Sequence, residues 1–364
     1  MFILTQARQN QNKQFQFNLR LMQNPPNSPI FNTHAPQNWP ANDARNLVTN
    51  AAECIYLSEA LRVAAEGVCD LQTIDLVLRE HGGFSQGPFE LADGRGLRAV
   101  AEQLKTTYHA WGEDPRLRVS PLMEAYVQRD KAGSAASSGF YSSGNGRPQA
   151  HAAPARLHAE PIPPVWLSPR AARRAETLML FKNLGVKIET GQSPSPQALT
   201  IVSPLGFDVT TVAVVERLDP ARTVGFDTLF NDSVCLRRVI ATNPVTRSDM
   251  KEAAYALFQQ DEKPVSVVND SAGFISQRVW AQLINIATEL CQQGHSHPDE
   301  VDAWMAEALG LKNGPLSIGN DLGPTNVLEV LFNMQTVYAD PCYRPSPWLR
   351  RRGAIGLSLL QISG

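Results

Sequence analysis

The chain has 364 residues, of which 43% are hydrophobic, so it is long enough for two or three domains with packed cores. Its net charge of −2 argues against a general nucleic-acid-binding surface. No apolar run approaches the roughly 18 residues of a membrane span, so we expect no membrane association. The five cysteines form no CxxC pair, which indicates reduced thiols in a cytoplasmic protein, and we expect no metal site.

Two low-complexity segments divide the chain. Residues 1–44 are rich in Asn, Gln and Pro, as in QNPPNSPIFNTHAPQNWP, and this composition predicts disorder. Residues 142–164 belong to a break rich in Ser, Gly, Ala and Pro, which predicts a linker. The ordered blocks that remain are 45–141 and 165–357.

The block 45–141 has the hydrophobic periodicity of helices. AAECIYLSEALRVAAEGV ends on Gly67 and Val68, a typical helix stop, and Asp70 can cap the next helix, LQTIDLVLREHG. GPFELADGRGLRAVAEQLKTTYHAWG predicts a third, longer helix, and SPLMEAYVQRDKAG predicts a fourth. We therefore expect a four-helix module.

Residues 165–268 alternate between two patterns. The strand-like runs are VWLS, VKIET, ALTIVSPLG, RTVGFDTLF, RRVIATNPV and PVSVVND. The helix-like segments between them are RAARRAETLMLFKNLG, TTVAVVERL and RSDMKEAAYALFQQ. Strands that alternate with helices predict a parallel α/β sheet of the doubly wound, Rossmann-like kind.

Residues 269–357 repeat the first helical module. At an offset of 227 residues, the pairs Gly67 and Gly294, Asp75 and Asp302, Gly83 and Gly310, Gly87-Pro88 and Gly314-Pro315, and Gly96 and Gly323 coincide. After the loss of one residue, Asp114-Pro115 meets Asp340-Pro341, and Ser120-Pro121 meets Ser346-Pro347. Gly and Pro mark backbone positions with special dihedrals, so these matches imply a shared scaffold. We predict a mainly α fold in which two copies of one helical domain flank a degenerate Rossmann-like domain.

Several motifs resemble one family. NDSAGFISQR, PDEVDAW, GPLSIGNDLG and DPCYRPSPWL in the second module, and EALRVAAEGVCDLQTIDLVLREHGGFSQGPFELADGRGL, SPLMEAYVQ and SGFY in the first, resemble the C-terminal helical domain of the 3-hydroxyacyl-CoA dehydrogenase family. The resemblance implies an NAD-dependent oxidation of L-3-hydroxyacyl-CoA thioesters to 3-ketoacyl-CoA in fatty-acid β-oxidation or aromatic-acid degradation. Some bacterial members carry two such units, the second degenerate. This chain resembles such a protein without its first NAD-binding domain.

The turn after the first strand should hold the cofactor pyrophosphate, but its sequence, SPRAARR, contains no GxGxxG. Pro169 replaces the flexible start, and the side chains that follow would crowd a phosphate. The literal near-match at residues 94–99 lies inside the helical module and is interpreted as a connection between helices. No residue is therefore assigned to cofactor binding.

The proton-abstracting histidine of the family lies three residues before an Asn-Pro. Asn243-Pro244 matches that dipeptide, but Ile240 occupies the histidine position, and isoleucine cannot transfer a proton. Glu252, downstream, is interpreted as a solvated surface charge. The remaining histidines fall in the helical modules or in low-complexity segments. His295 and His297, with Asp299, resemble a metal cluster but are better explained as a helix start before Pro298.

Two amides are the candidate site residues. The family places an Asn before an Arg at the start of the first helix, where it contacts the thioester-side carbonyl. Asn50 aligns with it in the first module, followed by Ala51, and Gln277 aligns with it in the second, followed by Arg278. Each could donate a hydrogen bond to substrate, or could only pack against or cap the start of a helix.

Two hypotheses of different class follow. In the first, the chain is a truncated 3-hydroxyacyl-CoA dehydrogenase with an incomplete catalytic core, for which NAD is the expected family cofactor but is not bound by this chain alone. In the second, it is a non-catalytic acyl-CoA-binding or dimerisation module. In both, the two helical domains are expected to pair as an internal pseudo-dimer, and acyl-CoA thioesters are the expected ligands.

Overall fold

The computed structural model describes residues 41–131, 139–141 and 162–361. All of them belong to one compact unit, which spans Asn38–Gly364. The disorder expected of residues 1–40 and the linker expected at 142–161 lie outside the described residues. Residues 41–44, which were expected to be disordered, form the beginning of the first helix, so this boundary was placed too late in the chain.

The first helical part contains five α-helices and a 3-10 helix among its described residues: α2 (Ala41–Ala65), α3 (Leu71–Glu80), α4 (Pro88–Arg95), α5 (Leu97–Ala110), η1 (Pro115–Leu117) and α6 (Pro121–Lys131). Asp70 caps α3 by accepting a hydrogen bond from the backbone N–H of Thr73, as predicted. The predicted single third helix was wrong. Gly96 has a φ of 88° that ends α4 before α5 begins, because a positive φ interrupts the helical ladder.

The second helical part has the same order of elements: α10 (Ser276–Gln292), α11 (Pro298–Leu309), α12 (Pro315–Leu322), α13 (Pro324–Tyr338), η4 (Pro341–Tyr343) and α14 (Pro347–Ile355). Here the predicted third helix breaks at Gly323, whose φ is also 88°. Each helical part is therefore built on five helices, where the sequence predicted four. The extra break falls at a glycine that both segments share.

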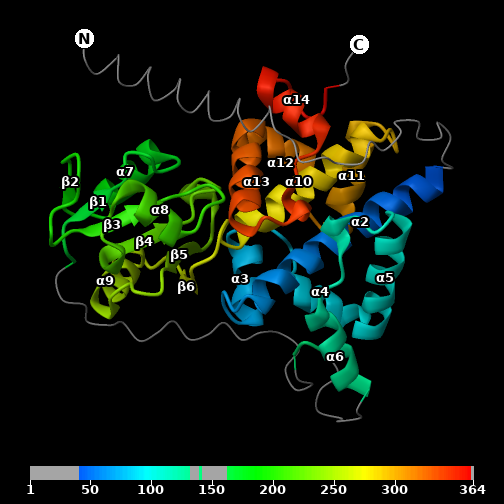
Figure 1. The fold of residues 1–364 in the computed structure, drawn as a ribbon, viewed down its shortest axis with the longest axis horizontal. Coiled ribbons are helices and arrows are strands. Elements are labelled where there is room, and N and C mark those ends of the chain that lie inside the picture. Colours follow the sequence, from blue (N-terminus) through cyan, green and yellow to red (C-terminus); the bar gives the residue numbers. More distant parts are fainter. Residues whose placement is uncertain (1–40, 132–138, 142–161, 362–364) are drawn as a thin grey trace. The chain divides into compact units, whose positions relative to one another are not determined.

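The sheet part contains β1 (Val165–Leu167), β2 (Ile188–Glu189), β3 (Leu199–Val202), β4 (Thr223–Phe226), β5 (Arg238–Thr242) and β6 (Val265–Asn269) in the spatial order β2-β1-β3-β4-β5-β6. The expectation of a parallel sheet was wrong at one place, since β4 and β5 pair antiparallel. Their connection contains only the short η3 (Asp232–Val234), and a parallel pair needs a longer crossover. The connections that do contain α-helices carry α7 (Arg174–Asn183), α8 (Val209–Glu216) and α9 (Ser248–Phe258), drawn around the sheet in Figure 1.

Alternate residues of the sheet face two different cores. Ile240 of β5 packs in a cluster with Phe181 of α7 and Phe258 of α9. Its neighbours Val239 and Ala241 belong instead to the large cluster that also contains the cores of both helical parts. A strand buried on both faces reads as a continuous apolar run, which explains the unbroken VIA of β5.

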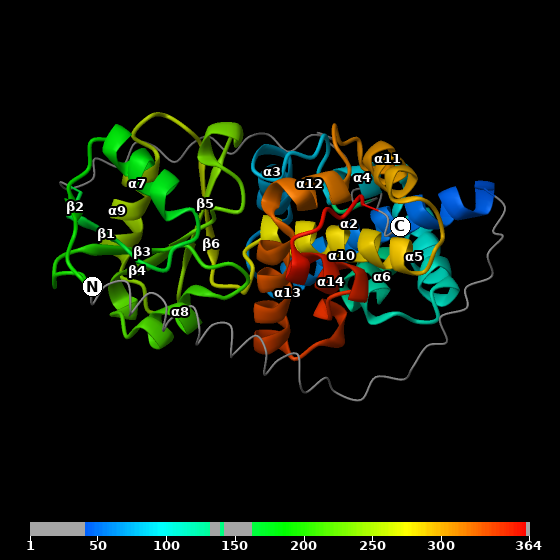
Figure 2. The ribbon, with the colours of Figure 1, turned by 90° about the horizontal axis from the view of Figure 1, so that it is seen from above.

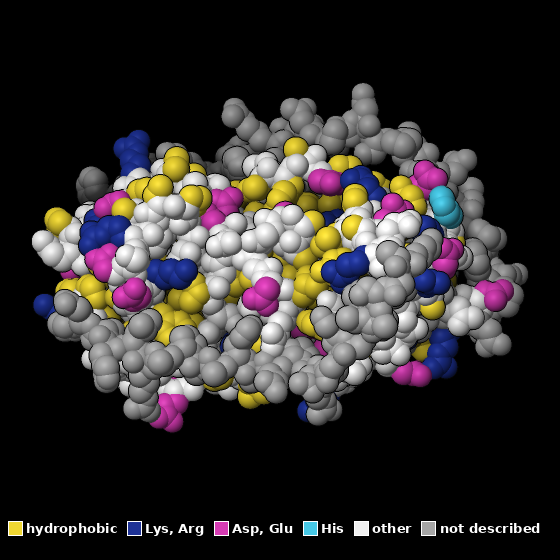
Figure 3. All heavy atoms as spheres, turned by 90° about the horizontal axis from the view of Figure 1, so that it is seen from below, with side chains coloured by type: hydrophobic (Ala, Val, Ile, Leu, Met, Phe, Trp, Pro, Cys, Tyr) yellow, Lys and Arg dark blue, Asp and Glu magenta, His cyan; other side chains and the backbone are white. Residues whose placement is uncertain are grey.

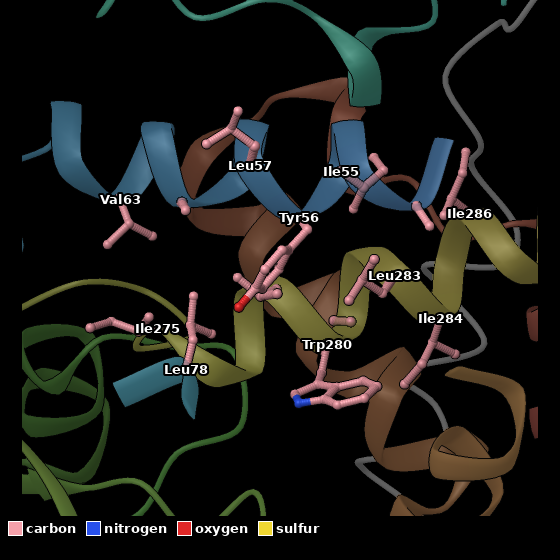
Figure 4. Packing of buried hydrophobic residues seen from close by; sticks show 14 of the residues in the cluster. Ile55, Tyr56, Leu57, Val63, Leu78, Ile275, Trp280, Leu283, Ile284 and Ile286 are labelled. Carbon is pink, nitrogen blue, oxygen red and sulfur yellow. The ribbon is translucent and has the colours of Figure 1, made fainter. Parts of the chain in front are cut away.

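The large core forms where α2 crosses α10. The two helices run side by side in Figure 2, and α2 also packs against α11. Figure 4 shows Ile55 and Tyr56 of α2 above Trp280 and Leu283 of α10. All four side chains are at most 2% exposed, and burial of each contributes on the order of 1.5–3 kcal/mol. The two helical parts therefore share one core.

The surface agrees with the balanced charge of the sequence. On the face shown in Figure 3, basic and acidic side chains are interspersed, and the basic ones do not gather into one patch.

Among the described residues, no helix combines the length and the hydrophobicity that crossing a membrane would require. All five cysteines are unpaired thiols, as predicted.

Candidate functional site

The turn between β1 and α7 is the place where a doubly wound sheet binds a phosphate. Here the backbone N–H groups of the turn form hydrogen bonds within the protein. The backbone N–H of Arg170 donates to Ser168 Oγ at 3.0 Å, and that of Ala172 donates to the carbonyl of Ser203 at 2.9 Å. Ser168 Oγ in turn donates to Glu216 at 2.6 Å. Two amides that could cradle a phosphate are therefore already engaged, so this turn does not fit the pyrophosphate of NAD.

The position expected for the proton-abstracting histidine lies in the middle of strand β5. Ile240 is fully buried and pairs with Phe226 on one side and Val267 on the other. The Asn243 amide donates to the carbonyls of Pro220 and Thr223, so it serves to fasten a turn. Glu252 is exposed on α9, as predicted. This edge therefore provides no group that could accept a proton from a substrate hydroxyl.

Gln277 lies in the first turn of α10 and is fully buried. Its Oε1 accepts from the backbone N–H of Gly206 at 2.8 Å. Its Nε2 donates to the carbonyl of Pro204 at 3.1 Å and to Asp227 Oδ1 at 2.9 Å. The amide thus joins the loop after β3, and the end of β4, to the second helical part. The three hydrogen bonds of this amide are all made to protein atoms.

A buried His–Ser–Asp group lies beside Gln277. His81 Nδ1 is 2.9 Å from Ser276 Oγ and 3.9 Å from Asp227 Oδ2. The side chains of His81 and Asp227 are 2% and 0% exposed, and Ser276 is fully buried. Sequence analysis set His81 aside as part of a helical module. Since 195 residues separate it from Ser276, no local pattern could have revealed the contact. Both neighbours face the same ring nitrogen, whereas a nucleophilic triad uses the two nitrogens separately.

Asn50 is placed in the interior of α2, because this helix begins nine residues earlier in the chain, at Ala41. It is half-buried, and its Oδ1 accepts from Gln103 Nε2 at 3.1 Å. Gln103 also donates to Glu53 at 2.8 Å, and Glu53 forms a two-bond ion pair with Arg95. The structure therefore does not bring Asn50 and Gln277 to one site.

A shallow hollow of about 300 Å³, open solvent included, lies next to this amide cluster. Leu57, Leu91, Val100 and Leu104 are among its apolar lining residues, and Gln103 is at its polar rim. An apolar floor with a few polar groups at its edge is the general composition of a small-molecule site. Asn50 contacts this hollow through Gln103, which accounts for its place beside it.

Arg278, which follows Gln277, is the centre of a buried charge network. Its guanidinium contacts Glu59 of α2 at 2.8 Å and Glu66, directly after the end of α2, at 2.6 Å. Tyr343 donates to Glu59 at 2.9 Å. Burial alone would raise the pKa of Glu59, but Arg278 and then Arg62 more than offset this and hold the pKa below its ordinary value. The arginine therefore acts as a tie between the two helical parts.

Equivalent carboxylates organise each helical part. Asp75 accepts from the backbone N–H groups of Phe89 and Glu90 and from Tyr141 Oη. Asp302 accepts from the N–H groups at the corresponding start of α12 and from the Ser317 hydroxyl. Burial raises the pKa of Asp75 to about 7, against the lowering effect of its hydrogen bonds. Both carboxylates serve as remote caps of a helix N-terminus.

Each helical part is closed by a segment that follows its last helix. Asp93 accepts from the backbone N–H groups of Phe140 and Tyr141 at 2.7 and 2.9 Å. At the offset of 227, Asn320 replaces Asp93, and it accepts from the N–H of Leu359 at 2.8 Å. Phe140 and Leu359 are both buried. Sequence analysis did not find this correspondence, because the spacing between the helix and the closing segment differs.

The histidines at the start of α11 behave as predicted. His297 is the N-cap, Pro298 opens the helix and Glu300 completes a capping box. In the part of the chain that the structure describes, no three His, Cys, Asp or Glu side chains are placed to hold a metal ion.

The fold and these motifs define a helical dehydrogenase-type domain joined to an α/β part. The model of the 3-hydroxyacyl-CoA dehydrogenase C-terminal domain matches residues 47–143 and 273–358, together about half of the chain. The chain belongs to the 3-hydroxyacyl-CoA dehydrogenase family.

Individual relatives agree with this assignment. The chain is 25% identical over 309 residues to the 3-hydroxyadipyl-CoA dehydrogenase of Escherichia coli, a match that covers 85% of this chain and 59% of the relative. It is 31% identical over 99 residues to the mitochondrial hydroxyacyl-coenzyme A dehydrogenase of Mus musculus, covering 27% of this chain and 32% of that protein.

A solved structure shows the same fold. The 3-hydroxybutyryl-CoA dehydrogenase of Escherichia coli K12 superposes with a TM-score of 0.64 at 24% identity, over 85% of this chain and 60% of the other. The chain therefore spans about three-fifths of the length of the first relatives it matches.

Proposed function

We propose that this protein is a truncated 3-hydroxyacyl-CoA dehydrogenase, a cytoplasmic member of the fatty-acid β-oxidation type whose own catalytic core is incomplete. The family reaction removes a hydroxyl proton and passes a hydride to NAD, so it needs a general base and a bound nicotinamide. The observation that carries the proposal is Ile240, an apolar core residue where the base should stand. The closed turn at Ser168 adds the second missing part. Oxidation then requires a dinucleotide-binding domain other than the sheet part described here.

We assign the two helical parts to two copies of one duplicated domain that pair as an internal pseudo-dimer. The support is the recurrence of unusual geometry at a constant offset. Gly96 and Gly323 share a φ of 88°, and Asp75 and Asp302 each bond the N-terminus of the helix that follows. The contact of α2 with α10, the first long helix of each part, supplies the pairing. Further oligomerisation of the chain is compatible with this arrangement.

An alternative function is a non-catalytic acyl-CoA-binding module. One observation favours it. The Asn50 amide and Gln103 stand beside the apolar hollow of the first helical part, where a thioester carbonyl could accept a hydrogen bond while an acyl chain covers the apolar floor. Gln277 does not offer the same possibility, because its amide is occupied by Gly206, Pro204 and Asp227.

Calorimetry on the purified chain separates these functions. We expect no heat from NAD, and weak binding of acetoacetyl-CoA that Asn50→Ala weakens about tenfold, which corresponds to the loss of one hydrogen bond to the ligand. Gln128→Ala, at an exposed position of α6, is the matched control. Binding of NAD would contradict the incomplete core. Silence from both ligands would remove the acyl-CoA role and leave a dimerisation module.

A further inference from the structure

The segment that closes the first helical part, residues 139–141, forms a short strap over α4. The backbone N–H groups of Phe140 and Tyr141 both donate to the carboxylate of Asp93 on α4. The buried ring of Phe140 packs edge-on against Phe89 of the same helix, with ring centroids 4.9 Å apart. The strap is therefore fastened to α4 by two hydrogen bonds and by an aromatic contact.

A second carboxylate joins the strap to the beginning of α4. The Tyr141 hydroxyl donates to Asp75 Oδ2 at 2.7 Å. The same carboxylate accepts from the backbone N–H groups of Phe89 and Glu90 at 3.1 and 3.0 Å. Asp75 is fully buried, so these three donors replace the water that a carboxylate would otherwise bind. One buried side chain thus holds both the strap and the N-terminus of α4.

The surroundings of Asp75 offer little compensation for a negative charge. The titratable groups near Asp75, Tyr141 and Asp93 are Tyr56 of α2, Arg79 of α3, Glu90 of α4 and Arg129 of α6. Arg79 forms its ion pair with Glu90. In the described part of the chain, Asp75 itself forms no ion pair. A buried carboxylate without a paired cation is costly to ionise, and the charge of Glu90 adds to that cost.

The second helical part closes in a different way. Asp302, which corresponds to Asp75, accepts from the N–H and the hydroxyl of Ser317 in α12 itself. The closing segment is held by Asn320, a neutral amide, which accepts from the backbone N–H of Leu359 at 2.8 Å. Only the first part therefore links its closing segment to a buried carboxylate, and the second part is an internal control.

Helix α4 is also one wall of the apolar hollow. Pro88, Leu91 and Ala92 line the hollow, whereas Phe89 and Asp93 contact the strap. Residues three or four positions apart lie on the same side of a helix, so these two sets occupy different sides of α4. The strap therefore holds the wall of the hollow from another side.

We propose that the strap is a pH-sensitive latch, which holds α4 in place while Asp75 carries a proton and releases α4 when that proton is lost. Burial raises the pKa of Asp75 to about 7 in the closed state, and contact with water would return it to its ordinary value of 3.8. The closed state is therefore favoured most at low pH, and it loses this advantage as the pH rises through about 7.

Hydrogen exchange of the full chain, resolved to single backbone amides and corrected for the intrinsic effect of pH, measures the opening. The protection of the Phe140 and Tyr141 N–H groups should fall about tenfold between pH 6 and pH 8, as linkage to a closed-state pKa near 7 requires. The N–H of Leu359 should keep its protection, because a neutral amide holds it. Asp75→Asn should abolish the change, whereas the matched Asp302→Asn should leave it intact.

Tyr141→Phe is a second variant that keeps Asp75 but removes its bond to the strap. At pH 6 it should lower the protection of the Phe140 N–H about fivefold, which corresponds to the loss of one hydrogen bond. Circular dichroism excludes misfolding of the variants. Three results would overturn the inference: strap protection that does not change with pH, a change that persists in Asp75→Asn, or a parallel loss at Leu359, which would indicate general unfolding.

Discussion

The two helical parts have the same elements in the same order, yet they differ in what covers the start of their first helix. In the second part, α10 begins at Ser276, directly after the sheet, and Gln277 and Arg278 are fully buried. In the first part, α2 runs unbroken from Ala41, and the corresponding residues are Asn50, half-buried, and Ala51. The same order of helices thus carries different interaction chemistry at the start of the first helix.

The largest expected effect comes from removing Arg278, which pairs with Glu59 and which has only Ala51 as its counterpart in the first part. Arg278→Met should lower the free energy of unfolding by about 3 kcal/mol, because the buried Glu59 then keeps only Arg62 as a counter-charge and Glu66 loses its arginine. Thermal and urea unfolding measure this loss. Arg45→Met is the matched control, since its ion pair is exposed and should contribute less than about 1 kcal/mol. Equal losses from both variants would mean that the buried network does not hold the parts together.

A matched glycine pair tests whether the two parts carry the same backbone strain. Gly96→Ala and Gly323→Ala should each cost on the order of 1–3 kcal/mol, because both positions have a φ of 88° that a Cβ disfavours. No side chain or backbone atom crowds a Cβ at Gly96, so its cost is conformational. Similar urea midpoint shifts for the two variants would support a common scaffold. A shift at one position only would count against it.

Substitution of the two candidate amides should lower stability by different amounts. Gln277→Ala should cost about 1–3 kcal/mol of stability, since it leaves the backbone N–H of Gly206 without its partner and removes the donor to the Pro204 carbonyl. Asn50→Ala should cost less than about 0.5 kcal/mol, because Asn50 is half-buried and loses one side-chain bond. Urea unfolding of the two variants side by side measures the difference. Comparable losses would show that both amides are structural.

The last expected effect is a dependence on pH rather than a loss at one fixed pH. The folded pKa of Asp75 is about 7, above the ordinary value of 3.8, so the folded state holds a proton that the unfolded state has lost. Its stabilising contribution is complete below about pH 4 and disappears as the pH rises to about 7, with a slope of at most about 1.4 kcal/mol per pH unit. Asp75→Asn should remove this slope from urea-unfolding curves. A slope that persists in the variant would place the proton elsewhere.

Much of the architecture could be predicted from Gly and Pro, because these residues report backbone dihedrals directly. The Gly and Pro residues located both helical parts and the start of α11 at Pro298, and the stop at Gly67 pointed to Asp70 as the next cap. The pattern could not reveal that Gly96 and Gly323 interrupt a helix, since a glycine inside a helical pattern is also tolerated. The antiparallel pairing of β4 with β5 depends on the connection between them, which has no periodicity to read.

The candidate site was predictable only in what it lacks. The glycine-free turn and Ile240 are local features, and the sequence displays them. The partners of Gln277 lie 50 to 73 residues away in the chain, and those of Arg278 lie up to 219 residues away. Contacts of that range depend on how three parts of the fold meet. No spacing rule within one helix or strand can supply them.

The single core shared by α2 and α10 also sets the order of events during synthesis. Glu59 can pair early with Arg62, but its second partner, Arg278, is made 219 residues later in the chain. At a synthesis rate of roughly 5–20 residues per second, this delay lasts roughly 10 to 40 s. For that time the side of α2 that packs against α10 and α11 is uncovered and is open to chaperones and to other nascent chains. A ribosome that pauses between the two helical parts would therefore expose this protein to aggregation when its folding is least complete.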